Sequence, residues 1–302
     1  DWMYRLGFDE AAGNYQALNF GRGGLEGDPL LAAAQAGYLD GISNGGGGIG
    51  LCPDGQSAEM ILPLWGCPDP DRDPGLDSQV VLHELTHGMT GRLLGDASGL
   101  NWRPGGGLDE GWSDFFATAM THRAAGEDPD AQYPLAPYTT YRYCKTYPPA
   151  PSDFTDNYVY GLRQFPFSTD NRINPLTWAD ADELTADYSG GIPPSPLVSQ
   201  QTGASTRHKV GPIWATTLWE VRSRIIAAHG GDVPLGNELT LQIVVDSLKM
   251  LPIDPGFIDA RDSMIDADCA ANACANEESI WGGFADRGLG YKAHASLAIA
   301  YE

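Results

Sequence analysis

Apolar residues recur with a helical period in one part of the chain, where they form a single broad stripe. They are Val80, Val81, Leu82, Leu85, Met89 and Leu93. This spacing is typical of a helix with one buried face. Asp77 or Ser78 supplies an N-cap, and Gly95 can end the element. The pattern therefore predicts a helix that begins near Asp77 and ends before Gly95.

The residues before this helix show shorter patterns. Residues 1–20 suit a helix and its exit, and residues 32–38 fit a short strand or a turn of helix. Residues 60–65 are apolar and predict a strand. Residues 41–57 are rich in glycine and are expected to form a loop. The first third of the chain is thus predicted to be irregular, with some strands.

The rest of the chain is predicted to be mainly helical. Gly105 to Gly107 are expected to lead into a second helix, from about Leu108 to Ala125. Residues 127–206 carry many Pro, Tyr and Asp residues and predict long, mostly irregular connections. Three or four helices are expected to complete the chain, over about residues 211–229, 236–250, 257–267 and 277–287.

The negative net charge of the chain argues against some classes of binding partner. The chain has 302 residues, with 40 acidic and 18 basic side chains and a formal net charge of -22. A surface this acidic repels phosphate backbones and anionic membranes. No apolar run approaches the roughly 20 residues that a membrane helix needs. We therefore expect neither nucleic acid nor a membrane as a partner.

Five cysteines suggest two local disulfides and one residue left over. Cys52 and Cys67 bracket a loop rich in Pro and Gly, and Cys269 and Cys274 are separated by four residues. Two such pairs favour an oxidising compartment. Cys144 is either free or paired outside this chain.

The segment His83-Glu84-Leu85-Thr86-His87 lies within the predicted central helix. A spacing of four residues places both imidazoles on one helical face, where they can bind one metal ion. Glu84 can face the same cleft and take a proton from a metal-activated water. The pattern predicts a catalytic zinc site, whereas the simpler interpretation is two surface histidines on an ordinary helix.

A catalytic zinc needs a third protein ligand, and Glu110 is the best candidate. It follows His87 by 23 residues, which allows a turn and an antiparallel return helix that brings Glu110 beside the histidines. Asp114 lies one helical turn beyond Glu110, where it can accept a hydrogen bond from an imidazole.

Several stretches in addition to this motif resemble the fungalysin family of secreted zinc metalloendopeptidases, which are relatives of thermolysin. In order along the chain they are Tyr4–Gln16, Pro53–Ser57, His83–His87, Glu110–Phe115, Asn174–Thr177, His208–Glu220 and Arg287–Gly290. They span nearly the whole chain, so the resemblance covers the fold as well as the site.

The resemblance implies an α+β, thermolysin-like fold with two lobes and the zinc site between them. Residues 1–94 would form a reduced N-terminal lobe with some strands, ending in the histidine-bearing helix. Residues 95–302 would form a mainly α-helical C-terminal lobe. The implied activity is zinc-dependent hydrolysis of peptide bonds in proteins by a secreted, extracellular endopeptidase. A separate propeptide or N-terminal segment is an expected partner, because family members carry a longer β-rich portion before the position of Asp1.

The resemblance also assigns roles to individual residues. His83, His87 and Glu110 are implied as the zinc ligands, and Glu84 as the general base. Asp114 resembles the carboxylate that orients the first histidine, and Asp109 occupies the place of a similar partner for the second. His208 matches the histidine that donates a hydrogen bond to the oxyanion, although it could instead simply cap a helix that begins near Gly211.

The chain departs from the family pattern at the substrate-binding edge. Family members have an Asn-rich segment there, whereas this chain has Gly45 to Gly48. The backbone of Gly46 and Gly47 could still pair with an extended peptide. Arg163 is a candidate for binding a substrate carbonyl. Phe165 and Phe167 replace the tyrosines that the family favours, so a hydroxyl group is missing there.

Three alternatives remain open from the sequence. A catalytically silent binding or structural protein could keep the zinc scaffold. Ser43 lies in a G-x-S-x-G pattern typical of serine hydrolases, but without the strand-turn-helix context that this pattern needs. Ca²⁺ is a second candidate cofactor, since Asp69, Asp71, Asp73 and Asp77 could wrap such an ion, although a solvated acidic loop is the default interpretation.

Overall fold

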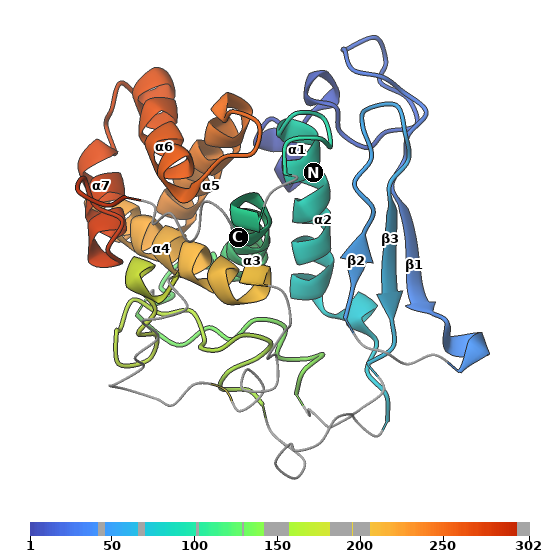
Figure 1. Cartoon of the computed structure of the whole chain (residues 1–302), viewed down its shortest axis with the longest axis horizontal. Coiled ribbons are helices and arrows are strands. Elements are labelled where there is room, and N and C mark those ends of the chain that lie inside the picture. Colours follow the sequence, from blue (N-terminus) through green and yellow to red (C-terminus); the bar gives the residue numbers. More distant parts are fainter. Residues whose placement is uncertain are drawn as a thin grey trace.

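The structure is a computed structural model that describes residues 1–41, 46–65, 70–100, 103–128, 130–141, 157–181, 195 and 206–294. A small β-sheet lies on one side of a central helix, and a group of helices packs on its other side (Figure 1). The strands all come from the first third of the chain, and the helical group from the last two thirds.

The sheet has three strands in the order β1-β3-β2. Strands β1 (Leu31–Ala36) and β3 (Glu59–Pro63) are parallel, and β2 (Gly48–Ile49) pairs with β3 in the antiparallel sense. The predicted strand near residues 60–65 is confirmed. The predicted loop over 41–57 is wrong at residues 48 and 49, because backbone pairing with β3 holds glycine in a strand that its own propensity does not favour.

The central helix α2 (Ser78–Leu93) begins and ends where the apolar pattern predicts. The Asp77 carboxylate accepts a hydrogen bond from the amide of Gln79 at the N-terminus. One side of α2 contacts β2 and the other contacts the next helix, α3 (Arg103–Thr121). Both flanks of the histidine-bearing helix are therefore packed against other parts of the chain.

Helix α3 begins earlier than the sequence predicts, since Gly105 to Gly107 lie inside it. The reason is a close crossing with α4 (Thr206–Ala228). A Cβ atom on Gly111 would lie 2.6 Å from the carbonyl oxygen of Gly211. At Gly107 a Cβ would lie 3.3 Å from Val210. These glycines allow two helix backbones to approach, and this packing outweighs their low helix propensity.

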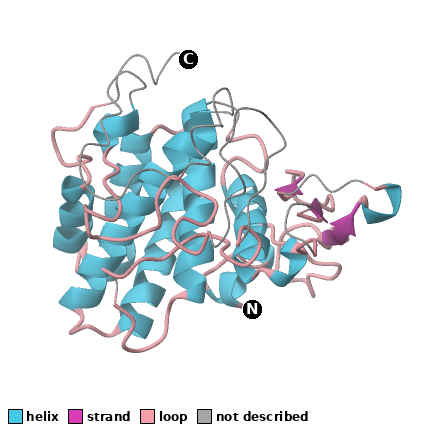
Figure 2. Ribbon diagram, turned by 90° about the horizontal axis from the view of Figure 1, so that it is seen from below, coloured by secondary structure: helices cyan, strands magenta, loops and turns pink. Residues whose placement is uncertain are grey.

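The predicted C-terminal helices are confirmed as α4, α5 (Val233–Met250), α6 (Phe257–Asn272) and α7 (Glu277–Asp286). Large aromatic side chains fill the space between them and α3, namely Trp112, Trp214, Trp219, Phe115, Phe257 and Phe284. Figure 2 shows this helical body with the strands set to one side. Among the described helices, none has the length and apolar character needed to cross a membrane.

Short helical segments and turns complete the described structure. They are α1 (Trp2–Arg5), η1 (Glu10–Ala12), η2 (Tyr38–Asp40), η3 (Pro74–Leu76) and η4 (Trp178–Ala181). Isolated β-bridges join Tyr133 to Phe167 and Leu135 to Gly161 in the irregular connection between α3 and α4. Arg163 in this connection contacts Glu110 and Asp114 of α3.

One of the two predicted disulfides is present. Cys269 and Cys274 are joined at the end of α6. The predicted bond between Cys52 and Cys67 is wrong, because Cys52 has a free thiol. Cys67 and Cys144 lie outside the described residues.

Candidate metal centre

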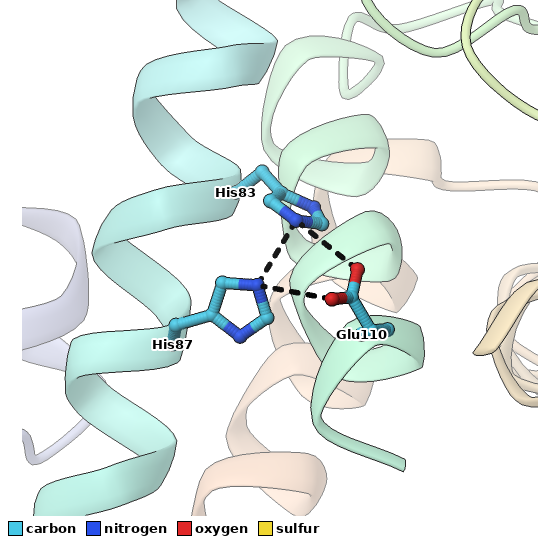
Figure 3. A group of neighbouring side chains, drawn as sticks. All are labelled: His83, His87 and Glu110. Atoms are coloured by element: carbon cyan, nitrogen blue, oxygen red, sulfur yellow. Dashed lines mark hydrogen bonds and ion pairs between the residues drawn. The ribbon is translucent and has the colours of Figure 1, made fainter. Parts of the chain in front are cut away.

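Two histidines on α2 and a glutamate on α3 point toward one another (Figure 3). The Nε2 atoms of His83 and His87 are 3.0 Å apart. Glu110 places Oε2 3.5 Å from His83 Nε2 and Oε1 4.0 Å from His87 Nε2. Residues four apart on α2 share one face, and the antiparallel α3 brings the carboxylate to that face.

The other ring nitrogen of each histidine faces a second carboxylate on α3. Nδ1 of His83 is 2.9 Å from Oδ1 of Asp114. Nδ1 of His87 is 2.7 Å from Oδ2 of Asp109, whose other oxygen accepts a hydrogen bond from the hydroxyl of Thr90. These contacts fix both ring orientations and direct both Nε2 atoms to the same point.

This donor set fits a zinc ion. When each Nδ1 donates its proton to a carboxylate, both Nε2 atoms present lone pairs to one another at 3.0 Å. Two lone pairs at that distance repel unless a cation lies between them. Zinc–ligand bonds of about 2.0–2.1 Å in a tetrahedron place ligands about 3.3 Å apart. The observed spacings of 3.0, 3.5 and 4.0 Å bracket that value.

Electrostatics at the centre also favours bound positive charge. Burial lowers the pKa of His83. The carboxylates of Asp114 and Glu110 raise this pKa by more than burial lowers it, so that it reaches about 10. His87 also has a raised pKa, because Asp109 outweighs the effect of burial. Burial raises the pKa of Glu110, but His208, His83 and Arg163 lower it more, so it stays ionised. The carboxylates around the two histidines therefore favour positive charge at the centre, which a divalent cation would supply.

Arg163 contacts two carboxylates of the centre, those of Asp114 and Glu110. It lies in the connection between α3 and α4 and is buried. Its Nε is 2.7 Å from Asp114 Oδ2, and its Nη2 is 2.7 Å from Asp114 Oδ1 and 3.0 Å from Glu110 Oε2. The Asp114 carboxyl group has a lowered pKa, since Arg163 and His83 together outweigh its burial. The guanidinium therefore balances part of the negative charge around the histidines.

His208 lies in the first turn of α4, at the opening of the centre. Its Nε2 is 2.9 Å from Glu110 Oε1, and 39% of its side chain is exposed. The simple interpretation of His208 as a helix cap is wrong, because α4 begins at Thr206 and includes His208. The close crossing at Gly111 and Gly211 explains why the first turn of α4 lies beside Glu110.

Glu84 lies at the wall of a cavity of about 350 Å³ beside the three candidate ligands. Gly46, Gly47, Arg163 and His208 line the same cavity. His83 also lines this cavity. His87 and Glu110 contact His83, and Asp109 and Asp114 contact the Nδ1 atoms of the two histidines. Gly45 and Ser43 lie outside the described residues.

Several apolar residues of the cavity wall could not be predicted from the sequence. Apolar side chains from separate segments line this cavity, including Trp65, Leu135 and Leu162. No local pattern marks such residues, because they meet only in the folded chain. Phe165 and Phe167 are fully buried in the core, and neither lines the cavity.

Two aspartates of the acidic loop before α2 accept hydrogen bonds from backbone amides. Asp73 accepts a hydrogen bond from the amide of Gly75 and another from the side chain of Gln35. Asp77 accepts hydrogen bonds from the amides of Gln79 and Thr139. A calcium site in this loop stays a prediction, since Asp69 lies outside the described residues.

Comparison with known proteins identifies the family of this chain. The model of the fungalysin metallopeptidase family (M36) matches residues 1–293. The chain belongs to the fungalysin family. A relative from Pyricularia oryzae, named extracellular metalloproteinase MEP, is 35% identical over 96% of this chain. An extracellular metalloproteinase from Aspergillus terreus is 33% identical over 97% of it. The chain spans about two fifths of the length of these relatives, 42% in each case.

A solved structure shares the fold of this fungalysin. The precursor of protealysin, a metalloproteinase from Serratia proteamaculans, aligns with a TM-score of 0.52 at 15% sequence identity. The alignment covers 96% of this chain and 74% of that one. The predicted fold class is confirmed: the chain has an α+β, thermolysin-like fold with two lobes, strands in the first and mainly helices in the second. The boundary between residues 94 and 95 stays a prediction.

Proposed function

We propose that this chain carries the active site of a secreted zinc endopeptidase. The observation that supports this most strongly is the convergence of His83, His87 and Glu110 beside a cavity that Glu84 lines. Membership of the fungalysin family supports the same conclusion. The three side chains would hold Zn²⁺.

Zn²⁺ held by these residues would supply Lewis acidity that activates water near neutral pH. Glu84 then acts as the general base: its carboxylate takes the proton of the attacking water and passes it to the leaving amine. His208 lies at the opening of the same cavity and donates a hydrogen bond to the developing oxyanion. One such donor contributes roughly 10²–10³ in rate.

The remaining residues of the cavity bind the substrate or support the ligands. Asp114 and Asp109 hold the imidazoles in orientation through Nδ1. Arg163 uses Nε and Nη2 for carboxylates, and we assign its Nη1 to a substrate carbonyl. The backbone at Gly46 and Gly47, next to the edge strand β2, pairs with an extended peptide.

We extend the proposal to location, partners and domains. The named extracellular relatives and the disulfide between Cys269 and Cys274 support secretion. Protein substrates follow from the activity, and the match to a precursor form of protealysin supports a propeptide or N-terminal segment as a further partner. Residues 1–94 and 95–302 then form the two lobes on either side of the site.

Cleavage of casein or a quenched peptide with and without a zinc chelator tests the proposal. Activity lost with the chelator and restored by zinc supports it. Glu84→Gln should keep bound zinc and lose nearly all turnover, and full activity in that variant would exclude Glu84 as the base. Zinc binding without any cleavage would indicate a silent scaffold. Cleavage that resists the chelator and disappears in Ser43→Ala would indicate a serine hydrolase.

A further inference from the structure

Gln79 joins three parts of the chain that lie far apart in the sequence. It lies in the first turn of α2, four residues before His83, and therefore on the same face of the helix. Its Nε2 donates a hydrogen bond to the hydroxyl of Thr121, the last residue of α3, at 3.0 Å. Its Oε1 accepts a hydrogen bond from the backbone amide of Ala136 at 2.6 Å. Both ends of one buried amide group thus make contacts with distant segments.

The two contacts require a side chain that donates and accepts at the same time. A backbone amide can only donate, so Gln79 must turn its oxygen toward Ala136. The Thr121 hydroxyl directs its one hydrogen to carbonyl groups of the preceding helical turn, at 2.8 and 3.0 Å. Its lone pairs then accept the hydrogen of Gln79 Nε2. An ionised carboxylate could not donate to Thr121, and an apolar side chain could make neither bond, so a glutamine suits this position specifically.

Ala136 is a buried residue of the cavity wall with an uncommon backbone conformation. Its φ of 51° lies in the left-handed region, which residues with a Cβ atom rarely adopt. Such a conformation persists only where surrounding contacts enforce it. The bond to Gln79 is one of these contacts, and the amide and hydroxyl of Thr140 both donate to the carbonyl oxygen of Ala136. Gln79 therefore helps to hold the wall in a shape that the local backbone does not favour.

The segment that contains Ala136 forms a large part of the cavity wall. Leu135, Ala136, Thr139 and Thr140 all line the cavity, as does Gln79 itself. The carbonyl oxygen of Leu135 accepts a hydrogen bond from the amide of Leu162, a further wall residue, at 2.9 Å. A shift of Ala136 would displace its neighbours in the wall, and with them the boundary of the space that a substrate side chain can occupy.

We infer that Gln79 is a specificity-determining positioning residue: supported by Thr121, it holds the segment around Ala136 and so sets the shape of the substrate cavity. This inference rests on the proposed function, because it takes the cavity to be the place where peptide side chains bind. The role is in substrate selection rather than in proton transfer or metal binding. Contacts made equally in the bound substrate and the transition state act on KM and leave kcat unchanged, so KM is the constant that should respond.

The first experiment measures hydrogen exchange at the amide of residue 136, a readout that needs no activity. Gln79→Met keeps the length of the side chain and removes both polar groups. We expect this amide to exchange about 10-fold faster in the variant, because it loses its acceptor. An unchanged exchange rate in Gln79→Met would overturn the inference.

Thr121 provides a second variant that leaves the cavity lining intact, since it is not among the residues described as lining the cavity. Thr121→Val removes the group that orients the Gln79 amide, so exchange at residue 136 should become about 3–10-fold faster. Thr121→Ser keeps the hydroxyl and should keep the wild-type rate. Equal rates in Thr121→Val and Thr121→Ser would overturn the part assigned to Thr121. If Gln79→Met does not fold, the comparison of the two Thr121 variants decides the inference.

The second experiment measures kcat and KM on quenched peptides whose residues on either side of the scissile bond are varied in turn among alanine, leucine and phenylalanine. At the position where the wild type discriminates most, we expect the ratio of kcat/KM between the best and the worst peptide to fall about 3–10-fold in Gln79→Met, chiefly through KM. Thr121→Val should shift this ratio in the same direction, because it acts on Ala136 through Gln79. A shift in Gln79→Met alone would show that Gln79 is only a wall side chain, and would overturn the positioning role.

Thr240→Val is the matched control. Thr240 is a buried threonine of α5, and its hydroxyl donates to the carbonyl of Gly236 in the preceding turn. The variant removes the same group as Thr121→Val and should leave both readouts within about twofold of the wild type. Changes as large as those in Thr121→Val would indicate a general loss of stability and overturn the inference. Bound zinc should be equal in all variants, and a loss of zinc that parallels the change in the peptide ratio would also overturn it.

The two experiments separate the inference from the proposed function. A wild-type chain that cleaves no peptide, combined with faster exchange in Gln79→Met, would refute the proposed function and support the contact. A wild-type chain that cleaves, combined with an unchanged exchange rate or an unchanged peptide ratio, would support the function and refute the role of Gln79.

Discussion

Arg163 grips both oxygens of Asp114, through Nε and Nη2 at 2.7 Å each, and both side chains are buried. The same carboxylate faces Nδ1 of His83. The irregular connection between α3 and α4 is therefore tied to the metal centre through a single aspartate. Because planar, two-point pairing restricts geometry more than one hydrogen bond does, the pair fixes the direction in which Asp114 meets the imidazole.

Replacing this aspartate should weaken zinc binding. Asp114→Asn removes the negative charge of the side chain that faces His83. The imidazole is then less firmly oriented and less basic. We expect zinc affinity to fall about 10–100-fold, measured by competition with a chelator of known affinity. Asp109→Asn tests the equivalent contact at His87. An affinity equal to that of the wild type in Asp114→Asn would show that the ring is held by packing alone.

Removing the partner of Asp114 should affect stability more than affinity. Arg163→Leu leaves two buried carboxylates without their cation, a change that typically costs about 3–5 kcal/mol. Bound zinc compensates part of this charge at Glu110, so the rise in Tm on adding zinc should be larger in the variant than in the wild type. Arg172→Leu is the matched control, because it breaks an exposed pair with Asp170 and should leave Tm unchanged. An equal response to zinc in Arg163→Leu and the wild type would contradict this account.

The helical part of the fold was predictable because its signals are local. The apolar stripe and the N-cap at Asp77 define α2 without reference to the rest of the chain. The spacing of His83, Glu84 and His87 carries its chemistry within five residues. Glu110 could be proposed as the third ligand because the 23 residues from His87 to Glu110 are enough for a turn and an antiparallel return helix. These features depend on helical periodicity, which holds whatever the helix packs against.

The errors arise where long-range packing decides the structure. Strand β2 forms in a glycine-rich stretch because β3 offers backbone partners. Helix α3 includes Gly107 because α4 approaches closely there. The close approach of Gly47 to Glu84 has no sequence signature, because it depends on two segments that meet only in the folded chain. Such features depend on which segments meet in space.

The crossing of α3 and α4 should be sensitive to a single methyl group. A Cβ on Gly211 would lie 2.7 Å from Cβ of Glu110 and 3.1 Å from the amide of Gly111. Gly211→Ala should therefore push the helices apart, destabilise the protein by about 1–3 kcal/mol and reduce zinc affinity. The measurements are chemical denaturation and zinc competition.

The control for this crossing is another glycine in the same helix pair. The nearest atom to a Cβ on Gly106 is 3.8 Å away, an ordinary contact. Gly106→Ala should leave zinc affinity unchanged and stabilise α3 by about 0.4–1 kcal/mol, because alanine favours the helix. If both variants behave alike, the crossing does not position Glu110.

A pH-dependent contribution to stability should come from Tyr15, which packs on the other side of α2. Its hydroxyl donates a hydrogen bond to the carbonyl of Gly88 at 3.1 Å, and the Arg92 guanidinium lies 4.2 Å from its ring centroid. Burial raises the pKa of Tyr15 to about 12, although Arg92 opposes the shift. Because the unfolded phenol titrates near 10, its contribution is complete below about pH 10 and is lost as pH rises toward 12. Tyr15→Phe should cost about 1 kcal/mol at neutral pH, and the difference from the wild type should shrink steadily above pH 10. Denaturant unfolding of both proteins between pH 7 and about pH 11.5 measures this difference, and a constant value across that range would show that the phenol titrates alike in the folded and unfolded chains.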